Sequence, residues 1–254
     1  MPTIPTFMGS DTSGQAALLG YGKGLPFVTG VRSVFFLGSN AEQSRVNARR
    51  NGARATVVGN PDWKNGYATL RGLSDFLRTA DMDDNPNLTL MVAMRATPGV
   101  QADGSNATKL VGMGNYRTTG AMIWTQSNPD FAALAVAGTS TYDNGAGGSA
   151  IRHTYVKTGN VDVTQWALYA FVREAGVGRR AYDLTRGTSQ IVADTAAPLR
   201  NTADAFCIGS ALSLYTGSVD VAVALNGSIP FTTTQMGKFA DYFRAYSGRR
   251  GITF

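Results

Sequence analysis

The chain has 254 residues, of which 43% are hydrophobic, and this is enough for one sizeable β domain but not for a second domain of full size. Thirty glycines and only two glutamates, Glu42 and Glu174, exclude a helical bundle and favour short strands joined by tight turns. The formal net charge is +6, but the basic residues stand singly or in pairs, which disfavours nucleic acid and leaves a solvated surface or an anionic partner such as a glycan.

Residues 1–30 place Pro2, Pro5 and Pro26 around a glycine-rich stretch with few strand signals. We predict that this segment is an extended arm and that residues 31–254 form the folded domain. An arm of this composition buries little surface by itself. It packs along its own domain, docks onto a neighbouring subunit or is mobile, and we prefer docking that builds a homo-oligomer.

The sequence also bears on where the protein is made. Its start has neither the basic residues nor the apolar stretch of a signal peptide, and no window holds the ~18 apolar residues of a membrane span. The single cysteine, Cys207, excludes an internal disulfide and lies in an apolar stretch typical of a buried strand. We therefore expect synthesis in a reducing cytoplasm and no membrane insertion.

Strand signals become regular from residue 31. Between residues 88 and 95 apolar side chains alternate, so that Leu88, Leu90, Val92 and Met94 share one face, as in a strand that covers a core. Turn residues separate the predicted strands, which cover residues 31–37, 53–58, 67–70, 76–78, 88–95, 109–112, 121–125, 131–136, 151–156, 166–173, 179–183, 190–193, 206–209 and 219–225. This pattern predicts an all-β fold of two packed antiparallel sheets.

A short helix is predicted near the C-terminus, over about residues 233–247. Thr232 and Gln235 have the spacing of a capping box, and Met236, Phe239 and Phe243 recur at helical spacing. The two phenylalanines are expected to pack on the sandwich rather than to bind a partner.

Several segments follow one another in an order known from one family. Residues 47–63 read as turn, strand, turn and tryptophan, residues 164–171 contain a tryptophan-bearing strand, and Ile208-Gly209 and Asp220 occupy later strands. At residues 179–184 relatives carry Tyr-x-Asp-Gly, whereas Leu184 stands here in place of the glycine. The chain thus resembles the concanavalin-A-like, laminin-G-like jelly rolls over roughly residues 31–250. The resemblance implies a two-sheet antiparallel jelly-roll sandwich and is specific for the fold, not for a ligand.

Catalytic signals are weak. The jelly-roll glucanases resemble one another in a Glu-x-Asp-x-x-Glu strand, which this sequence lacks. His153 is the sole histidine, and no Gly-x-Ser-x-Gly elbow accompanies it, so it reads as an ordinary strand residue. A pair of aspartates cannot be recognised at this stage. We predict that the protein is not an enzyme.

Ligand recognition in lectin-like folds combines an aromatic platform with polar side chains on loops at the rim of the sandwich. The indole rings of Trp63 and Trp124 would stack on a sugar if they were exposed. Tryptophans at strand ends, however, usually fill the edge of the core. The candidate ligand-binding residues are Tyr116, Arg117, Tyr142, Asp143 and Asn144.

No cofactor is predicted, and calcium is the one metal with a candidate site. Residues 81–87 offer hard oxygen donors with the spacing that opens an EF-hand loop. Pro86, however, occupies the position that needs glycine, and no glutamate closes the loop, so an ordinary polar turn is the better interpretation. Because some laminin-G-like relatives bind calcium at loop ends, Asp83 and Asp84 remain candidates.

The function that fits these observations is a non-enzymatic structural protein of a bacteriophage virion, placed on the tail, a fibre or the capsid surface. It would be made in the bacterial host cytoplasm and attached to other virion proteins through residues 1–30, with a lectin-like domain that binds host-surface polysaccharide. Two alternatives remain open: a purely architectural decoration protein, and a polysaccharide-cleaving enzyme with an unfamiliar site.

Deletion of residues 1–30 tests the docking role of the arm. The remaining sandwich should fold and become monomeric, because the contact between subunits is lost. Light scattering measures the mass in solution, and an unchanged oligomer would contradict the docking.

Overall fold

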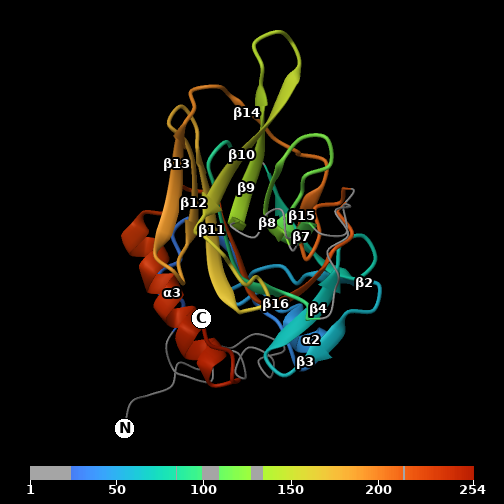
Figure 1. Cartoon of the computed structure of the whole chain (residues 1–254). Coiled ribbons are helices and arrows are strands. Elements are labelled where there is room, and N and C mark those ends of the chain that lie inside the picture. The colour runs from blue at the N-terminus through green and yellow to red at the C-terminus, as the bar shows by residue number, and fades with distance from the viewer. Residues whose placement is uncertain (1–23, 84, 99–108, 127–133, 214) are drawn as a thin grey trace.

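Two β-sheets face each other in the computed structural model, which describes residues 24–83, 85–98, 109–126, 134–213 and 215–254 (Figure 1). Sheet A has eight strands in the order β13 (Thr188–Ala193), β12 (Gly178–Asp183), β11 (Ala167–Glu174), β6 (Leu88–Ala96), β16 (Ser218–Gly227), β4 (Tyr67–Arg71) and β3 (Asp62–Lys64), with β1 (Val31–Phe36) also paired to β16.

Sheet B also has eight strands among the described residues. Their order is β10 (Ser149–Lys157), β9 (Leu134–Asp143), β8 (Ala121–Gln126), β7 (Lys109–Gly114), β15 (Ala205–Ile208), β5 (Phe76–Met82) and β2 (Thr56–Val58), with β14 (Pro198–Leu199) also paired to β9. Each pair of neighbouring strands is antiparallel. The predicted two-sheet antiparallel jelly-roll sandwich is confirmed.

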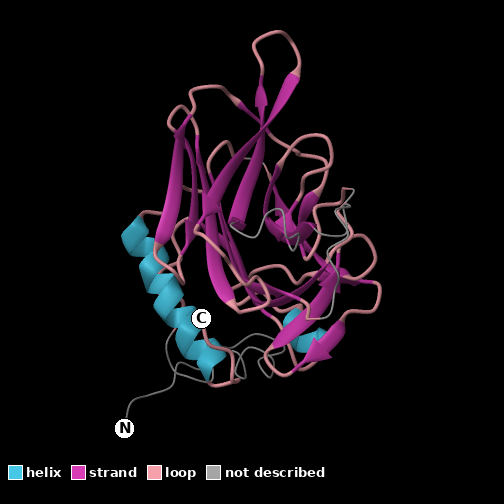
Figure 2. Ribbon diagram, viewed as in Figure 1, coloured by secondary structure: helices cyan, strands magenta, loops and turns pink. Residues whose placement is uncertain are grey.

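Two helices complete the described part of the chain. The four-residue α2 (Ala41–Ser44) follows β1 and is capped by Asn40, whose side chain accepts from the Gln43 N–H. The longer α3 (Thr233–Gly248) begins at the predicted capping box, in which Thr232 and Gln235 bond reciprocally. Figure 2 shows α3 lying along the outside of the sandwich. Neither helix has the length and apolar content needed to cross a bilayer.

The core has two layers, and β6 contributes to both. Between the sheets, Val92 and Met94 join the inner core with Phe171 of β11. On the outer side of sheet A, Met91 and Ala93 are also fully buried, because α3 covers this face. The sequence predicted that one face of β6 covers a core, and this prediction was incomplete. The second face of β6 is buried as well, because α3 packs on it.

The last part of the predicted arm packs against its own domain. Leu25 and Phe27 are partly buried on the outer layer, and the Phe27 ring centroid lies 4.8 Å from that of Phe239. Residues 1–23 lie outside the described residues. Because residues 24–30 help to cover the core, an arm deletion that leaves the domain intact should end at residue 23.

Cys207 lies in β15 and is fully buried, as the sequence predicted. Burial disfavours the thiolate and raises the pKa of this thiol to about 12. The thiol therefore packs as a small apolar group.

The outer layer should account for much of the stability. Phe239 is fully buried and contacts Phe27, Phe231 and Phe243. Replacing it with alanine should lower the free energy of unfolding by about 3–5 kcal/mol, because a large cavity remains. Urea unfolding measures this loss. The exposed neighbour Lys238 is the control, since Lys238→Ala should change stability by no more than ~0.5 kcal/mol, and equal effects of both variants would contradict the packing.

Candidate binding groove on sheet A

The outer face of sheet A is apolar where α3 covers it and polar beyond the helix. The polar part spans β3, β4, the start of β16 and the end of β6, and holds a cleft of about 560 Å³ that we call the sheet-A groove. Its lining residues are Asp62, Lys64, Tyr67, Thr69, Arg71, Arg95, Thr97, Pro98, Thr216, Gly217, Ser218 and Asp220.

A tight hairpin forms one side of the groove. Lys64 pairs with Tyr67 across the two-residue turn Asn65-Gly66, and Gly66 has a φ of 86°, a left-handed conformation that glycine adopts without strain. Alternation along β4 then sends Ala68 and Leu70 into the inner core and Tyr67, Thr69 and Arg71 to the outer face. A local sequence pattern thus places three polar or aromatic side chains in one row.

The floor of the groove is organised around Asp220, which is 1% exposed. Its Oδ1 accepts hydrogen bonds from the hydroxyls of Thr69 at 2.7 Å and Thr97 at 3.1 Å. Its Oδ2 accepts from Arg95 Nε at 2.9 Å. The Thr97 hydroxyl also lies 3.0 Å from Ser218 Oγ. The buried charge is paired and hydrogen-bonded, so this polar floor is fixed in advance of any ligand.

The Tyr67 ring lines the groove beside the floor, and the Trp166 ring packs against it; we call the two rings the aromatic wall. The Arg95 guanidinium carbon lies 5.3 Å from the Tyr67 ring centroid and 4.8 Å from that of Trp166. The two rings meet edge to face with centroids 5.3 Å apart. Both side chains are half-buried, so part of each ring faces solvent.

A short turn before β11 positions Trp166. The Asp162 carboxylate accepts from the N–H and the hydroxyl of Thr164 at 2.9 and 2.6 Å, and from the Gln165 amide at 3.1 Å. These bonds lower the pKa of Asp162, the Thr164 hydroxyl most of all. The Val163 carbonyl accepts from the Ala96 N–H at 2.7 Å, which ties the turn to the end of β6.

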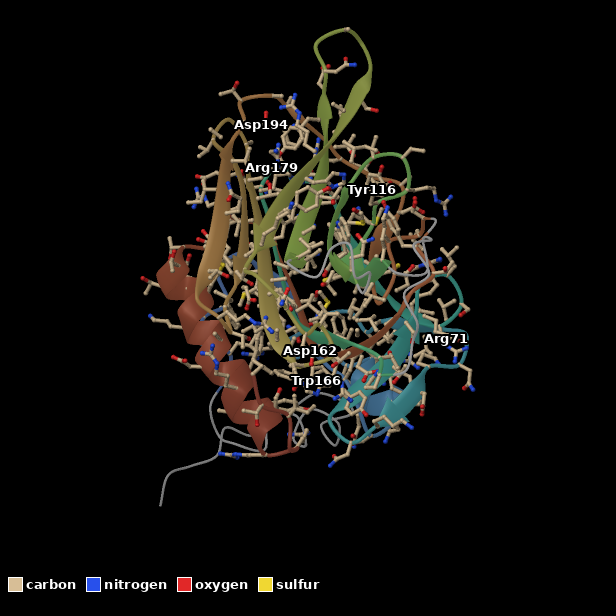
Figure 3. All side chains as sticks on the ribbon, in the orientation of Figure 1. Arg71, Tyr116, Asp162, Trp166, Arg179 and Asp194 are labelled. Carbon is tan, nitrogen blue, oxygen red and sulfur yellow. The ribbon has the colours of Figure 1, made fainter. Side chains whose placement is uncertain are left out.

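At the other end of the groove, β4 finishes with the exposed Arg71. A second cleft of about 370 Å³ adjoins here, lined by Asn60 and Asp75 and by three residues that it shares with the sheet-A groove, Asp62, Thr69 and Arg71. In Figure 3, Arg71 and Trp166 lie at the same end of the molecule. The shared lining makes the two clefts one extended groove.

The carboxylates of the groove are held by charge pairs. Two carboxylates line the larger cleft, and both have cationic partners: Asp220 pairs with Arg95, and Asp62 pairs with Lys64 at 2.8 Å. Hydroxyls, carboxylates, guanidinium groups and the half-buried Tyr67 ring in one cleft suit a ligand that has both hydroxyl groups and apolar faces.

The sequence-predicted residues Tyr116 and Arg117 lie elsewhere, between β7 and β8. Tyr116 is only 6% exposed and stacks on Tyr215, 6.5 Å away between ring centroids, on the outer face of sheet B. Arg117 is exposed and forms an ion pair of 3.7 Å with Asp204.

The other predicted residues lie at the end of β9. Tyr142 is 2% exposed and lies between the sheets, with the guanidinium carbons of Arg152 and Arg179 at 5.3 and 5.1 Å from its ring centroid. Asp143 and Asn144 accept hydrogen bonds from backbone N–H groups of the turn that follows. The five predicted residues therefore do not gather in one site.

The two tryptophans that the sequence analysis considered as sugar platforms, Trp63 and Trp124, both lie outside the groove lining. Trp63 packs against the inner core. Trp124 is 4% exposed and lies under Tyr215 on the outer face of sheet B. Trp166, which the sequence placed in a strand, lies just before β11 and packs on Tyr67, a residue that lines the sheet-A groove.

The candidate calcium ligand Asp83 is buried and neutralised by Arg173. Arg173 Nη2 and Nη1 lie 2.6 and 3.2 Å from the two Asp83 carboxylate oxygens. Arg173 also donates to the carbonyls of Asn85 and Pro86. Asp84 lies outside the described residues. Among the described residues no three His, Cys, Asp or Glu side chains gather as a metal site.

Sequence reasoning missed Tyr67, Arg71, Arg95, Trp166 and Asp220 as site residues. A partial signal exists in the alternation along β4 and β16, where polar residues take the positions opposite to the inner core. That signal does not say which outer faces α3 leaves open.

No family model and no curated protein matches the sequence. Solved structures do match. The binding domain of botulinum neurotoxin DC in complex with SialylT has a TM-score of 0.56 at 9% identity, over 83% of this chain and 51% of that chain. The same domain in complex with rat synaptotagmin II gives 0.56 at 8% identity, over 84% and 52%.

A third similar structure is botulinum neurotoxin type C, described as depending on interaction with two ganglioside molecules to enter cells. Its TM-score is 0.54 at 8% identity, over 83% of this chain and 51% of that chain. The chain thus spans about half the length of these domains. At such identities the likeness concerns the fold alone, which agrees with the predicted two-sheet β-sandwich.

His153 lies apart from the groove, on the outer face of sheet B. Its Nδ1 is 2.8 Å from the Thr139 hydroxyl, which accepts from Trp124 Nε1 at 2.8 Å. Burial, followed by the charges of Lys109 and Arg179, lowers the pKa of His153 below its ordinary value of 6.5. The histidine is therefore held neutral.

The protein should lose stability as the pH falls. A depressed pKa in the folded state means that stability is full above the unfolded value of 6.5 and is lost as pH falls through the folded value. Thermal melting between about pH 7.5 and 5.5 should show a drop that is smaller in His153→Gln. Asp81, whose pKa burial raises, is present in both proteins. Equal drops in melting temperature in the wild-type protein and His153→Gln would contradict the assignment of this pH dependence to His153.

Proposed function

We propose that the protein is a non-enzymatic, glycan-binding jelly-roll domain whose sugar ligand lies in the sheet-A groove. The observation that carries the proposal is a cleft that combines the Tyr67 ring with the hydrogen-bonded floor around Asp220, together with Trp166, which packs on Tyr67 beside the cleft.

The chemistry of sugars fits this combination. A pyranose ring has an apolar C–H face that packs on an aromatic side chain, and a rim of hydroxyls that needs hydrogen-bond partners. Thr69, Thr97 and Ser218 supply hydroxyls beside the Asp220 carboxylate. Because these groups already hold one another, the groove loses little conformational freedom when a ligand binds.

The fold agrees with a binding role. Solved domains of similar architecture are described in complex with SialylT or as interacting with ganglioside molecules. This chain covers about half of those domains, so the support is for the architecture and not for any one ligand.

The domain is proposed to be non-catalytic because both carboxylates of the larger cleft have cationic partners. A glycosidase of the usual kind needs one carboxyl group that stays protonated as the acid and a second as base or nucleophile. The role of the acid does not suit a carboxylate held by an arginine or a lysine, because a cationic partner favours the ionised form.

We propose further that the domain belongs to a bacteriophage virion and binds polysaccharide on the host surface. The support is the glycine-rich composition, the buried free thiol of Cys207, which suits synthesis in a reducing cytoplasm, and an N-terminal segment suited to attachment. In this role the partners of residues 1–30 are other virion proteins.

Removal of the aromatic wall should abolish sugar binding. Trp166→Ala should weaken binding of the protein to bacterial cells and to immobilised glycans by about tenfold or more, because a half-buried aromatic contact is lost. Tyr155→Ala is the matched control, since Tyr155 is a half-buried ring on the outer face of sheet B.

The outcomes are distinct. Loss of binding in Tyr155→Ala alone would move the site to sheet B. An absence of saturable binding by the wild-type protein would leave a purely architectural role, and sugar fragments detected by mass spectrometry would establish cleavage.

A further inference from the structure

The three cations that line the sheet-A groove differ in their charge partners. Lys64 pairs with Asp62 at 2.8 Å, and Arg95 pairs with Asp220 at 2.9 Å. Arg71 forms no ion pair with any described residue and is exposed. With the other two pairs neutralised, Arg71 leaves the lining of the larger cleft with one net positive charge.

Arg71 also lies where the two clefts meet, because it lines both. Two carboxylates line the smaller cleft with it. Asp62 pairs with Lys64, and Asp75 already accepts from the Ser74 hydroxyl and the Asn60 N–H, each at 2.7 Å. These two bonds, followed by the charge of Arg71, lower the pKa of Asp75. Asp75 therefore interacts with the arginine through its charge and not through an ion pair of the described residues, and the exposed Arg71 side chain lines both clefts.

We propose that the glycan bound in the sheet-A groove is an acidic oligosaccharide, and that Arg71 binds its carboxylate or sulfate group while a sugar ring farther along the same oligosaccharide packs on Trp166. This inference rests on the proposed function, since it concerns the same groove. Both residues lie at the same end of the molecule (Figure 3). Arg71 ends the row of Tyr67, Thr69 and Arg71 on β4, and Tyr67, at the start of this row, contacts Trp166.

The physical basis is the geometry of the guanidinium group. It presents a planar fork of N–H donors that matches the two oxygens of a carboxylate or sulfate, and such charge-assisted hydrogen bonds are stronger than neutral ones. An exposed arginine on a flat surface would bind anions only weakly, because water and salt screen it. In the groove, Trp166 and the polar floor hold the sugar, so that the acidic group is presented to Arg71 at high local concentration.

The inference is tested on an array of oligosaccharides that pairs neutral members with carboxylated and sulfated counterparts of the same backbone. Wild-type protein, Arg71→Gln, Arg71→Lys and Trp166→Ala are compared. Arg50→Gln is the matched control, because Arg50 is exposed, lies outside the groove and loses the same charge. Bound glycans are then titrated by calorimetry at low and high salt.

The wild-type protein should bind acidic members and leave their neutral counterparts unbound or weakly bound. Arg71→Gln should weaken acidic binding by roughly tenfold or more and reduce its salt dependence, whereas Arg50→Gln should leave both unchanged. Arg71→Lys should recover only part of the affinity, because it keeps the charge and loses the fork. The carboxylated and sulfated members distinguish the two kinds of anion.

Three outcomes would overturn the inference in different ways. In the first outcome, neutral and acidic members bind equally well, Trp166→Ala abolishes this binding and Arg71→Gln does not change it. This outcome would refute the role of Arg71 and leave the glycan-binding function intact. Equal losses of affinity for acidic glycans in Arg71→Gln and Arg50→Gln would show that the net charge of the protein, and not the position of Arg71, determines binding. Binding of no array member would refute the proposed function together with this inference.

Discussion

The structure depends on how far α3 extends over the outer face of sheet A. Its 16 residues span about 24 Å, and over that length the strands beneath present small and apolar side chains such as Ala93 and Ala170. Beyond it the same strands present Arg95, Thr97 and Asp220. One face of one sheet is therefore core at one end and open surface at the other, and the groove lies at that border.

Asp220 connects stability with the site. A carboxylate that is almost fully buried would be costly without partners, and Arg95, Thr69 and Thr97 together satisfy it. The same contacts hold the Arg95 guanidinium against the two rings of the wall. Hence the interactions that make the buried charge tolerable also fix the shape of the groove, and no separate device is needed to organise it.

Local signals sufficed for much of the fold and for little of the site. Alternation and turn residues located most strands, and the capping box located α3 within one residue of both ends. The three-residue β3 and the four-residue α2 were missed because elements so short have no period to detect. The groove was missed because its contacts are non-local: Thr69 and Asp220, which share a hydrogen bond, lie 151 positions apart. Tyr142, expected on a loop, is buried because β9 continues to Asp143.

The most direct test of the account is a crystal structure of the protein with an oligosaccharide that binds it on the array. The account predicts electron density for the sugar in the sheet-A groove, with one ring on Trp166 and an acidic group within hydrogen-bond distance of Arg71. A sugar bound instead to the aromatic face of sheet B around Trp124 and Tyr155, with the groove empty, would contradict it.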